Sequence, residues 1–185
     1  MNNSMTLPPP RAIVDFWLAA GPEKWFNKDA GFDAEIRARF LAAQEAAARG
    51  ELSAWEATPE GAIALLILLD QFSRNLYRGE ARTFAADPMA RGIADRAIAR
   101  GDDMALGMPL RQFFYLPFMH SELLADQERS VALYRALGDA DLQKFADEHA
   151  DIIRRFGRFP HRNPVLGRAT TPDEQAYLDA GGFAG

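Results

Sequence analysis

The sequence contains no cysteine, and this absence removes several kinds of chemistry at once. Without a thiol, the chain has no disulfide framework, no thiolate nucleophile and no cysteine-ligated zinc or iron–sulfur site. Only three residues are lysine (Lys24, Lys28 and Lys144), so arginine carries most of the positive charge. The formal net charge is −5, which argues against a nucleic-acid partner because surfaces that bind nucleic acid are usually basic.

Long hydrophobic runs are also absent. The longest, residues 62–69, is far shorter than the roughly 20 apolar residues needed to cross a bilayer. Residues 1–11 are polar and then proline-rich, without the charged start and apolar stretch of a signal peptide. We therefore expect a cytoplasmic protein with no membrane partner, in which residues 1–8 form a flexible segment.

The three histidines do not form a local metal-binding pair. Ligands on one helix face stand three or four positions apart, and no histidine or carboxylate occupies those positions beside His120, His149 or His161. A glycine-flanked serine nucleophile and a phosphate-binding glycine loop are missing as well. The sequence thus predicts no metal site and no cofactor, and it disfavours nucleotide hydrolysis and hydride transfer. Whether the protein is an enzyme stays open.

Helix signals, by contrast, recur along the whole sequence, and no stretch alternates as a strand does. A chain of 185 residues is long enough for one domain with a substantial core, so we expect a single all-helical domain over residues 1–185. Its helices should pack as a bundle or as stacked antiparallel hairpins, with the apolar third helix at the centre. About eight are predicted, over residues 10–20, 32–49, 59–78, 87–101, from 109 through 117, 126–137, 140–156 and from 171 onward.

The first polar motif follows the apolar run on the central helix and reads Asp-Gln-Phe-Ser-Arg-Asn at residues 70–75. Asp70 and Arg74 stand four apart, as do Gln71 and Asn75, so each pair can meet on one helix face. Because Asp70 continues the apolar stripe, we expect it to be buried and paired. The motif is either an ion pair that organises the core or one wall of a pocket.

The second motif is Tyr-Leu-Pro-Phe-Met-His-Ser-Glu at residues 115–122. Pro117 is expected to kink the fifth helix and to free a backbone carbonyl in apolar surroundings, a common place for polar function. His120 would lie on the core-facing stripe of that helix, with Glu122 close by. It is either a satisfied core residue or a functional group polarised by neighbouring carboxylates.

The third motif is an arginine-rich stretch around the end of the seventh helix, residues 148–163. His149 lies on the apolar face of that helix and is interpreted as structural. Arginines near a helix C-terminus complement the helix dipole, which is one interpretation of the cluster. Guanidinium groups also bind carboxylate and phosphate well, which is the other. The ligand-binding candidates in this stretch are Arg158, His161, Arg162 and Asn163.

Four stretches occur in a fixed order along the chain: Asp-Gln-Phe-x-Arg-Asn at 70–75, Leu-Pro-Phe-x-His-Ser-Glu at 116–122, Asp-Gln-Glu at 126–128 and Arg-Phe-Gly-Arg-Phe-Pro-His-Arg-Asn at 155–163. In this order they resemble the family called domain of unknown function 924, over nearly the whole chain. Ser73 departs from the family pattern, since proline is common there. The resemblance implies helical hairpins similar to tetratricopeptide repeats. It implies no activity.

These observations lead to one main hypothesis, an internal pocket for a small anionic or polar ligand. If the protein is an enzyme, His120 or His161 would be the acid–base group and the arginines an electrostatic clamp. Two alternatives are a peptide-binding scaffold of tetratricopeptide type and polar motifs that only stabilise the core. The sequence does not determine the oligomeric state. The candidate pocket residues are Asp70, Gln71, Arg74, Asn75, His120, Glu122, Arg158, His161, Arg162 and Asn163.

Overall fold

A computed structural model describes residues 6–185, and over that range the chain forms helices and no strand. The predicted all-α class is confirmed. The flexible segment expected at residues 1–8 falls mainly on residues 1–5, which lie outside the described residues. Two compact units can be distinguished: unit 1 runs to Arg78 and includes Arg82–Pro117, and unit 2 comprises Gly79–Ala81 and Phe118–Gly185. A single domain and a tetratricopeptide-type arrangement stay predictions.

Unit 1 holds four of the eight helices that the sequence predicts. The side chain of Thr58 caps α4 by accepting a hydrogen bond from the backbone N–H of Gly61. Gly101 ends α6 in the left-handed conformation, with φ at 82°. The elements are α1 (Pro10–Ala20), α2 (Pro22–Trp25), α3 (Ala30–Ala48), η1 (Ser53–Ala57), α4 (Pro59–Leu66), η2 (Ile67–Phe72), α5 (Ser73–Leu76), η3 (Ala81–Phe84), α6 (Asp87–Arg100), α7 (Asp102–Leu106) and η4 (Leu110–Phe114).

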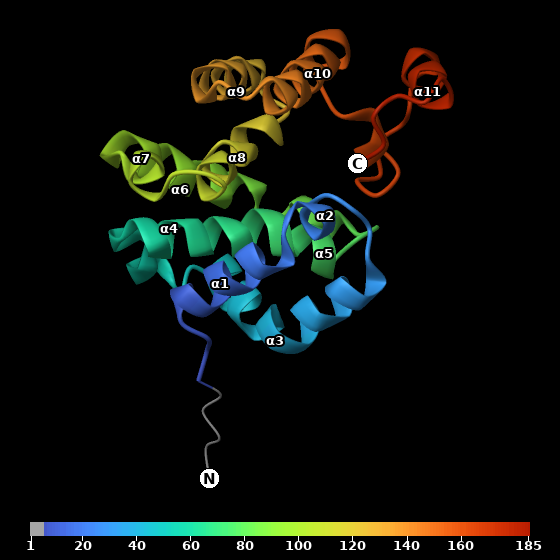
Figure 1. The fold of residues 1–185 in the computed structure, drawn as a ribbon. Coiled ribbons are helices and arrows are strands. Elements are labelled where there is room, and N and C mark those ends of the chain that lie inside the picture. The colour runs from blue at the N-terminus through green and yellow to red at the C-terminus, as the bar shows by residue number, and fades with distance from the viewer. Residues whose placement is uncertain (1–5) are drawn as a thin grey trace. The chain divides into compact units, whose positions relative to one another are not determined.

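The helix predicted over residues 59–78 lies at the centre of unit 1, but it is not a uniform α-helix. Between α4 and α5 the chain forms η2, a π-helical stretch, and every residue from 61 to 73 is buried. α4 contacts α1 and α6, and η2 contacts α3, so this path has neighbours on several sides (Figure 1). Single π-turns inside α-helices are often found at functional sites, and this one carries the first half of the first motif.

Aromatic rings fill the core around that helix. Trp17 is fully buried, and its ring centroid lies 5.8 Å from that of Phe72 and 5.6 Å from that of Phe113. Phe72 in turn lies 5.3 Å from Phe40 on α3. Because each buried aromatic side chain removes a large apolar area from water, this cluster is the main stabilising element of unit 1.

Unit 2 is built on a helical hairpin followed by an irregular segment. α9 (Leu124–Leu137) and α10 (Ala140–Phe156) pack against each other across a two-residue link. Asp139 caps α10 by accepting from two backbone N–H groups. After α10 come a short 3₁₀ turn, η5 (Pro160–Arg162), and α11 (Pro172–Asp179). One buried apolar cluster here consists of Ile152, Ile153 and Phe159, with Phe156 and Tyr177 packed against it. Tyr134 on α9 and Ala150 on α10 are also fully buried.

The helix predicted from Pro109 through residue 117 is wrong. The chain forms η4 there and then the four-residue α8 (Leu116–Met119), which spans the point where unit 1 gives way to unit 2 along the chain. Proline fixes its own φ and lacks an N–H, so Pro117 falls in the first turn of a new helix rather than kinking an old one. His120 consequently follows α8 instead of lying on a helix stripe.

Candidate functional site

In unit 1 the first motif forms a buried ion-pair network. Asp70 is 1% exposed, and its Oδ1 lies 3.1 Å from Nη1 of Arg74, so the predicted pair is present. Arg74 also donates from both Nη atoms to the two carboxylate oxygens of Asp87, at 3.0 Å each. Burial on its own lowers the pKa of Arg74, but the two carboxylates outweigh it and the pKa is raised. The guanidinium therefore stays charged inside the unit.

The other polar residues of this motif have partners that the sequence does not reveal. Gln71 donates to the carboxylate of Asp70 at 2.5 Å. Asn75 donates to the carboxylate of Asp33 on α3 at 2.7 Å, so Gln71 and Asn75 use different acceptors despite their spacing. Ser73 donates to the carbonyl of Leu69, within the π-helical stretch, at 2.6 Å. Each of these bonds fixes the central helix to itself or to α3.

A groove of about 380 Å³ opens beside this motif on unit 1. Ser73 links the two, because its hydroxyl also accepts from Nε2 of Gln44, at 3.0 Å. Gln44 in turn accepts from the hydroxyl of Tyr77 at 2.8 Å. None of the ten predicted site residues lines the groove. Alanines and six larger side chains form its walls: Gln44, Glu45, Arg49, Tyr77, Arg82 and Met89.

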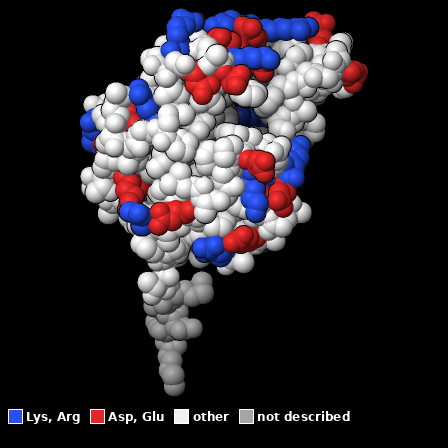
Figure 2. Space-filling view, viewed as in Figure 1, with Lys and Arg blue, Asp and Glu red and all other residues white. Residues whose placement is uncertain are grey.

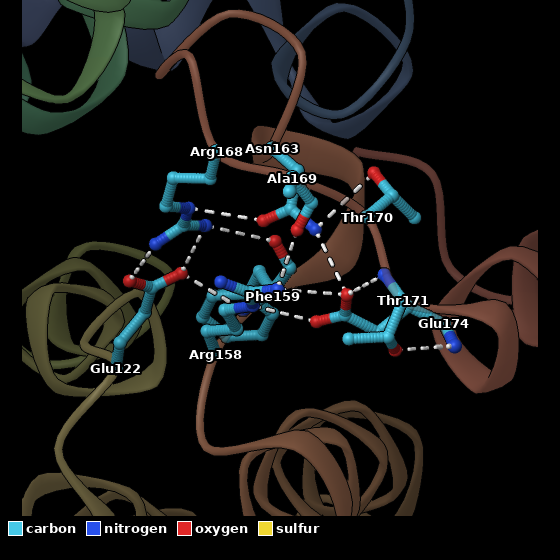
Figure 3. A network of polar contacts seen from close by, with 9 residues as sticks. All are labelled: Glu122, Arg158, Phe159, Asn163, Arg168, Ala169, Thr170, Thr171 and Glu174. Atoms are coloured by element: carbon cyan, nitrogen blue, oxygen red, sulfur yellow. Dashed lines mark hydrogen bonds and ion pairs between the residues drawn. The ribbon is translucent and has the colours of Figure 1, made fainter.

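In unit 2 the second and third motifs meet, as Figure 3 shows. Glu122 accepts from the backbone N–H of Phe159 at 2.8 Å and from Nη1 and Nη2 of Arg168 at 2.7 and 2.9 Å. Partial burial alone raises the pKa of Glu122, but the bonds from Arg168 and Phe159 outweigh it and leave this pKa lowered. Glu122 is thus an ionised acceptor that holds the third motif in place.

A second ion pair lies next to the first in the same network (Figure 3). Arg158 donates to both carboxylate oxygens of Glu174, at 2.6 and 2.9 Å. Glu174 is 2% exposed and also accepts from Asn163 and from the backbone N–H of Thr171, which completes the capping box of α11. The hydrogen bonds from Arg158 are the largest of the causes that lower the pKa of Glu174 to about 2.

Two of the three histidines of the sequence lie against one buried phenylalanine in unit 2, and the third lies near one of these two. The ring of Phe159 lies 5.6 Å from that of His149 and 5.7 Å from that of His161. His120 is 6.4 Å from His149, and its backbone carbonyl accepts from Nη2 of Arg162 at 2.9 Å. His149 is mostly buried and bonds through Nδ1 to the carbonyl of Phe145, which agrees with a structural role.

The predicted site residues therefore fall into two groups. Those at 70–75 lie in unit 1, and six lie together in unit 2: His120, Glu122, Arg158, His161, Arg162 and Asn163. That both groups surround one cavity stays a prediction. Among the partners that sequence reasoning missed are Asp33, Asp87, Gln127, Arg168 and Glu174. Asp87 and Glu174 lie in the first turns of helices whose starts the sequence indicates, and Gln127 lies in the motif at 126–128. No feature of the sequence pointed to Arg168.

Gln127 explains how the chain leaves α8. It is fully buried, and its Nε2 donates to the carbonyls of Met119 and Ser121, both at 2.6 Å. Because no helix is kinked at Pro117, the carbonyl expected to be freed there is not explained by a kink; instead, carbonyls at and after the end of α8 accept from this side chain of α9. These hydrogen bonds of Gln127 connect two of the sequence motifs, Asp-Gln-Glu at 126–128 and Leu-Pro-Phe-x-His-Ser-Glu at 116–122.

On the visible face, charged side chains of both signs lie intermixed rather than in a field of one sign (Figure 2). This agrees with the many arginine–carboxylate pairs within each unit, such as that of Arg96 with Glu56 at 2.6 Å. Between residues 6 and 185, no helix has the length and apolar character to span a membrane. Over the same range, no three histidine, aspartate or glutamate side chains are grouped so as to hold a metal ion.

The protein is all-α, and residues of its four sequence motifs make polar contacts inside each unit. A family model described as a bacterial protein of unknown function (DUF924) matches residues 13–182, and the chain belongs to this family. The resemblance drawn from the four motifs is thus confirmed. The chain is also similar to a solved structure of a protein of unknown function from Agrobacterium tumefaciens, at 52% identity. That match has a TM-score of 0.90 and covers 92% of this chain and 97% of the other. No curated protein matches the chain.

Proposed function

We propose that the protein binds a small anionic molecule in the groove of unit 1. The observation that carries this proposal is the groove itself, whose volume of about 380 Å³ falls within the range of about 300–1,000 Å³ typical of small-molecule sites. Such a volume suits a compact ligand better than the extended peptide of a helical scaffold. The first motif then acts indirectly, because Ser73 supports the floor of the groove through Gln44.

The charges on the groove walls favour an anion. Arg49 and Arg82 contribute two guanidinium groups and Glu45 one carboxylate. Arg49 already donates to both carboxylate oxygens of Glu51, at 2.7 and 2.9 Å, so Arg82 is the group that can turn towards a ligand. Arg82 stacks over the ring of Tyr77 at 4.0 Å and lies 3.8 Å from Glu45, a long and exposed ion pair that costs little to rearrange. Guanidinium groups bind carboxylates and phosphates through paired hydrogen bonds.

The start of α6 adds to this preference. Ala86 and Met89 line the groove, and Ala86 is the residue before α6, where its side chain cannot cap the first N–H groups. The partial positive charge at a helix N-terminus attracts anions. Asp87, the first residue of α6, does not line the groove, and Arg74 binds both of its carboxylate oxygens. The absence of cysteine agrees with a reducing compartment such as the cytoplasm, where we expect this binding to take place.

The test is a thermal-shift titration with inorganic phosphate and with succinate, on the wild type and on Arg82→Gln. A ligand at ten times its dissociation constant stabilises the folded state by about 1.4 kcal/mol. We expect this shift in the wild type and its loss in Arg82→Gln. Arg39→Gln is the matched control, because Arg39 also stacks on a ring and pairs with a glutamate but lies outside the groove. Equal shifts in both variants, or no shift in the wild type, would contradict the proposal.

A further inference from the structure

The segment that follows α11 places one more aromatic ring on the histidine cluster of unit 2. The ring centroid of Phe183 lies 4.5 Å from that of His149 and 5.1 Å from that of His161. Phe159, beneath them, is 6.5 Å away. Phe183 therefore touches two imidazole rings and faces a buried phenyl ring, although it belongs to a short segment outside any helix.

Few contacts hold that segment: besides the ring of Phe183, Gly185 approaches the ring of His161. Its sequence, Ala-Gly-Gly-Phe-Ala-Gly at residues 180–185, offers little apolar area apart from Phe183. Backbone bonds fix its start, and then the N–H of Phe183 donates to the hydroxyl of Tyr177 at 2.9 Å. Phe183 is 38% exposed, whereas Phe159 is fully buried. Segments with few buried contacts open at the lowest free-energy cost, so this one is expected to open before the rest of unit 2.

Glycine allows the segment to reach its position. A Cβ at Gly182 would lie 2.4 Å from the ring of Tyr177, so only glycine lets the backbone pass this close. Gly181 has a φ of 81°, which is in the region that favours glycine. The two glycines thus turn the chain over Tyr177 and deliver the ring of Phe183 to His149 and His161.

We propose that Phe183 fills a binding slot for a planar aromatic ring, and that residues 181–185 form a displaceable strap over it. The walls of the slot are the rings of His149, His161 and Phe159. Aromatic rings favour other rings in stacked or edge-on contact, and the phenyl ring of Phe183 shows that a ring of that size fits. A small aromatic ligand would replace Phe183 and release the strap. This inference does not depend on the groove in unit 1.

The first experiment measures indole binding to the full chain by proton NMR of the histidine rings. In Phe183→Ala the slot has no internal occupant, so we expect indole to bind at least tenfold more tightly than to the wild type and to shift the signals of His149 and His161. Phe26→Ala is the control, because it removes an even more exposed phenylalanine from unit 1. It should bind indole as the wild type does. Equal affinities in all three proteins, or unchanged histidine signals, would overturn the proposal.

A second measurement uses the wild type alone, in case Phe183→Ala affects folding. The protein is labelled with fluorophenylalanine, and Phe183→Leu identifies the signal of Phe183 by its absence. At saturating indole this signal should move to the position of a solvent-exposed ring, while the signal of the buried Phe159 shifts but stays dispersed. A Phe183 signal that does not respond to saturating indole would show that the ring is not displaced, and the strap would be ruled out.

Discussion

The two units use polar side chains in opposite ways. In unit 1 the ion pair of Asp70 and Arg74 sits at the edge of a large aromatic core, on a helix that is buried along its length. In unit 2 the pairs of Glu122 with Arg168 and of Arg158 with Glu174 hold the irregular segment between α10 and α11, which carries Phe159 of the apolar cluster. The same arginine–carboxylate chemistry thus supplements packing in one unit and replaces part of it in the other.

The reason lies in the backbone. Helices satisfy their own N–H and C=O groups, whereas an irregular segment must find partners elsewhere. In unit 2 side chains supply them: Glu122 accepts from the N–H of Phe159, Arg168 donates to its carbonyl, and Arg158 donates to the carbonyl of Ala169. The comparison predicts that unit 1 is most sensitive to loss of apolar volume and unit 2 to loss of charge.

The largest effect is expected from Phe72→Ala in the core of unit 1. Phe72 is fully buried against Trp17 and Phe40, and truncation of such a ring typically costs about 3–5 kcal/mol of unfolding free energy. Urea denaturation followed by tryptophan fluorescence measures it. Phe26→Ala, at 57% exposure, should cost less than about 1 kcal/mol. If Phe72→Ala unfolds at the same urea concentration as the wild type, unit 1 is not sensitive to loss of apolar volume, and the contrast between the units fails.

Helix positions were largely predictable because they depend on local signals. The ends of α1, α4, α6 and α10 follow proline, glycine and capping residues that the sequence displays. The stretch after Gly107 was not predictable, because its apolar residues are equally compatible with a continuous helix and with a 3₁₀ turn that restarts at Pro117. The π-helical stretch was also missed, since its widened turn has no distinct residue pattern.

The candidate site was predictable only in part. Spacing of four residues found the pair of Asp70 and Arg74, because both lie on one helix. The contact of Glu122 with Arg168 joins residues 46 positions apart, so only the folded chain reveals it. For the same reason the groove was missed: its walls come from α3, the turn after α5, η3 and the start of α6, and none of these carries a motif.

An intermediate effect is expected from Glu174→Gln in unit 2. The folded-state pKa of Glu174 is lowered from 4.5 to about 2, chiefly by hydrogen bonds from Arg158. A lowered pKa stabilises the folded state above the unfolded-state value, so this contribution is present above pH 4.5 and is lost as pH falls towards 2. Amide hydrogen exchange of α11 as a function of pH measures the free energy at which this helix opens.

At pH 7 the substitution of Glu174 should cost roughly 1–3 kcal/mol, because Arg158 and two further donors lose a charged acceptor. The variant should also lose most of the acid sensitivity of α11. Asp173→Asn is the control, since it removes one carboxylate from the same helix turn at an exposed position. If Glu174→Gln and Asp173→Asn have the same pH profile, the ion pair does not hold α11, and the distinction between the units is weakened.

The smallest effect is expected from Tyr115→Phe, which changes the stability of unit 1 at high pH. Tyr115 is fully buried, its hydroxyl donates to Asp103 at 2.6 Å, and burial together with this bond raises its pKa from 10.0 to about 12. A raised pKa contributes stability that is complete below the unfolded-state value and disappears as pH rises from 10.0 to about 12. Tyr115→Phe removes this bond and also the bond that the hydroxyl accepts from Nε of Arg111 at 2.7 Å. Because Arg111 and Asp103 lie 3.7 Å apart and stay paired with each other, the net cost at pH 7 should be about 0.5–1.5 kcal/mol.

An absorbance titration of tyrosinate tests this assignment without relying on stability. The sequence has four tyrosines, and in the wild type the phenol of Tyr115 should ionise late, with its transition moved towards pH 12. Tyr115→Phe should lack this late step, and Tyr177→Phe, which removes a tyrosine from unit 2, should keep it. A late step that persists in Tyr115→Phe would place the perturbed phenol elsewhere. The loss of stability at high pH could then not be assigned to Tyr115 in unit 1. The loss of stability at low pH would still be assigned to Glu174 in unit 2.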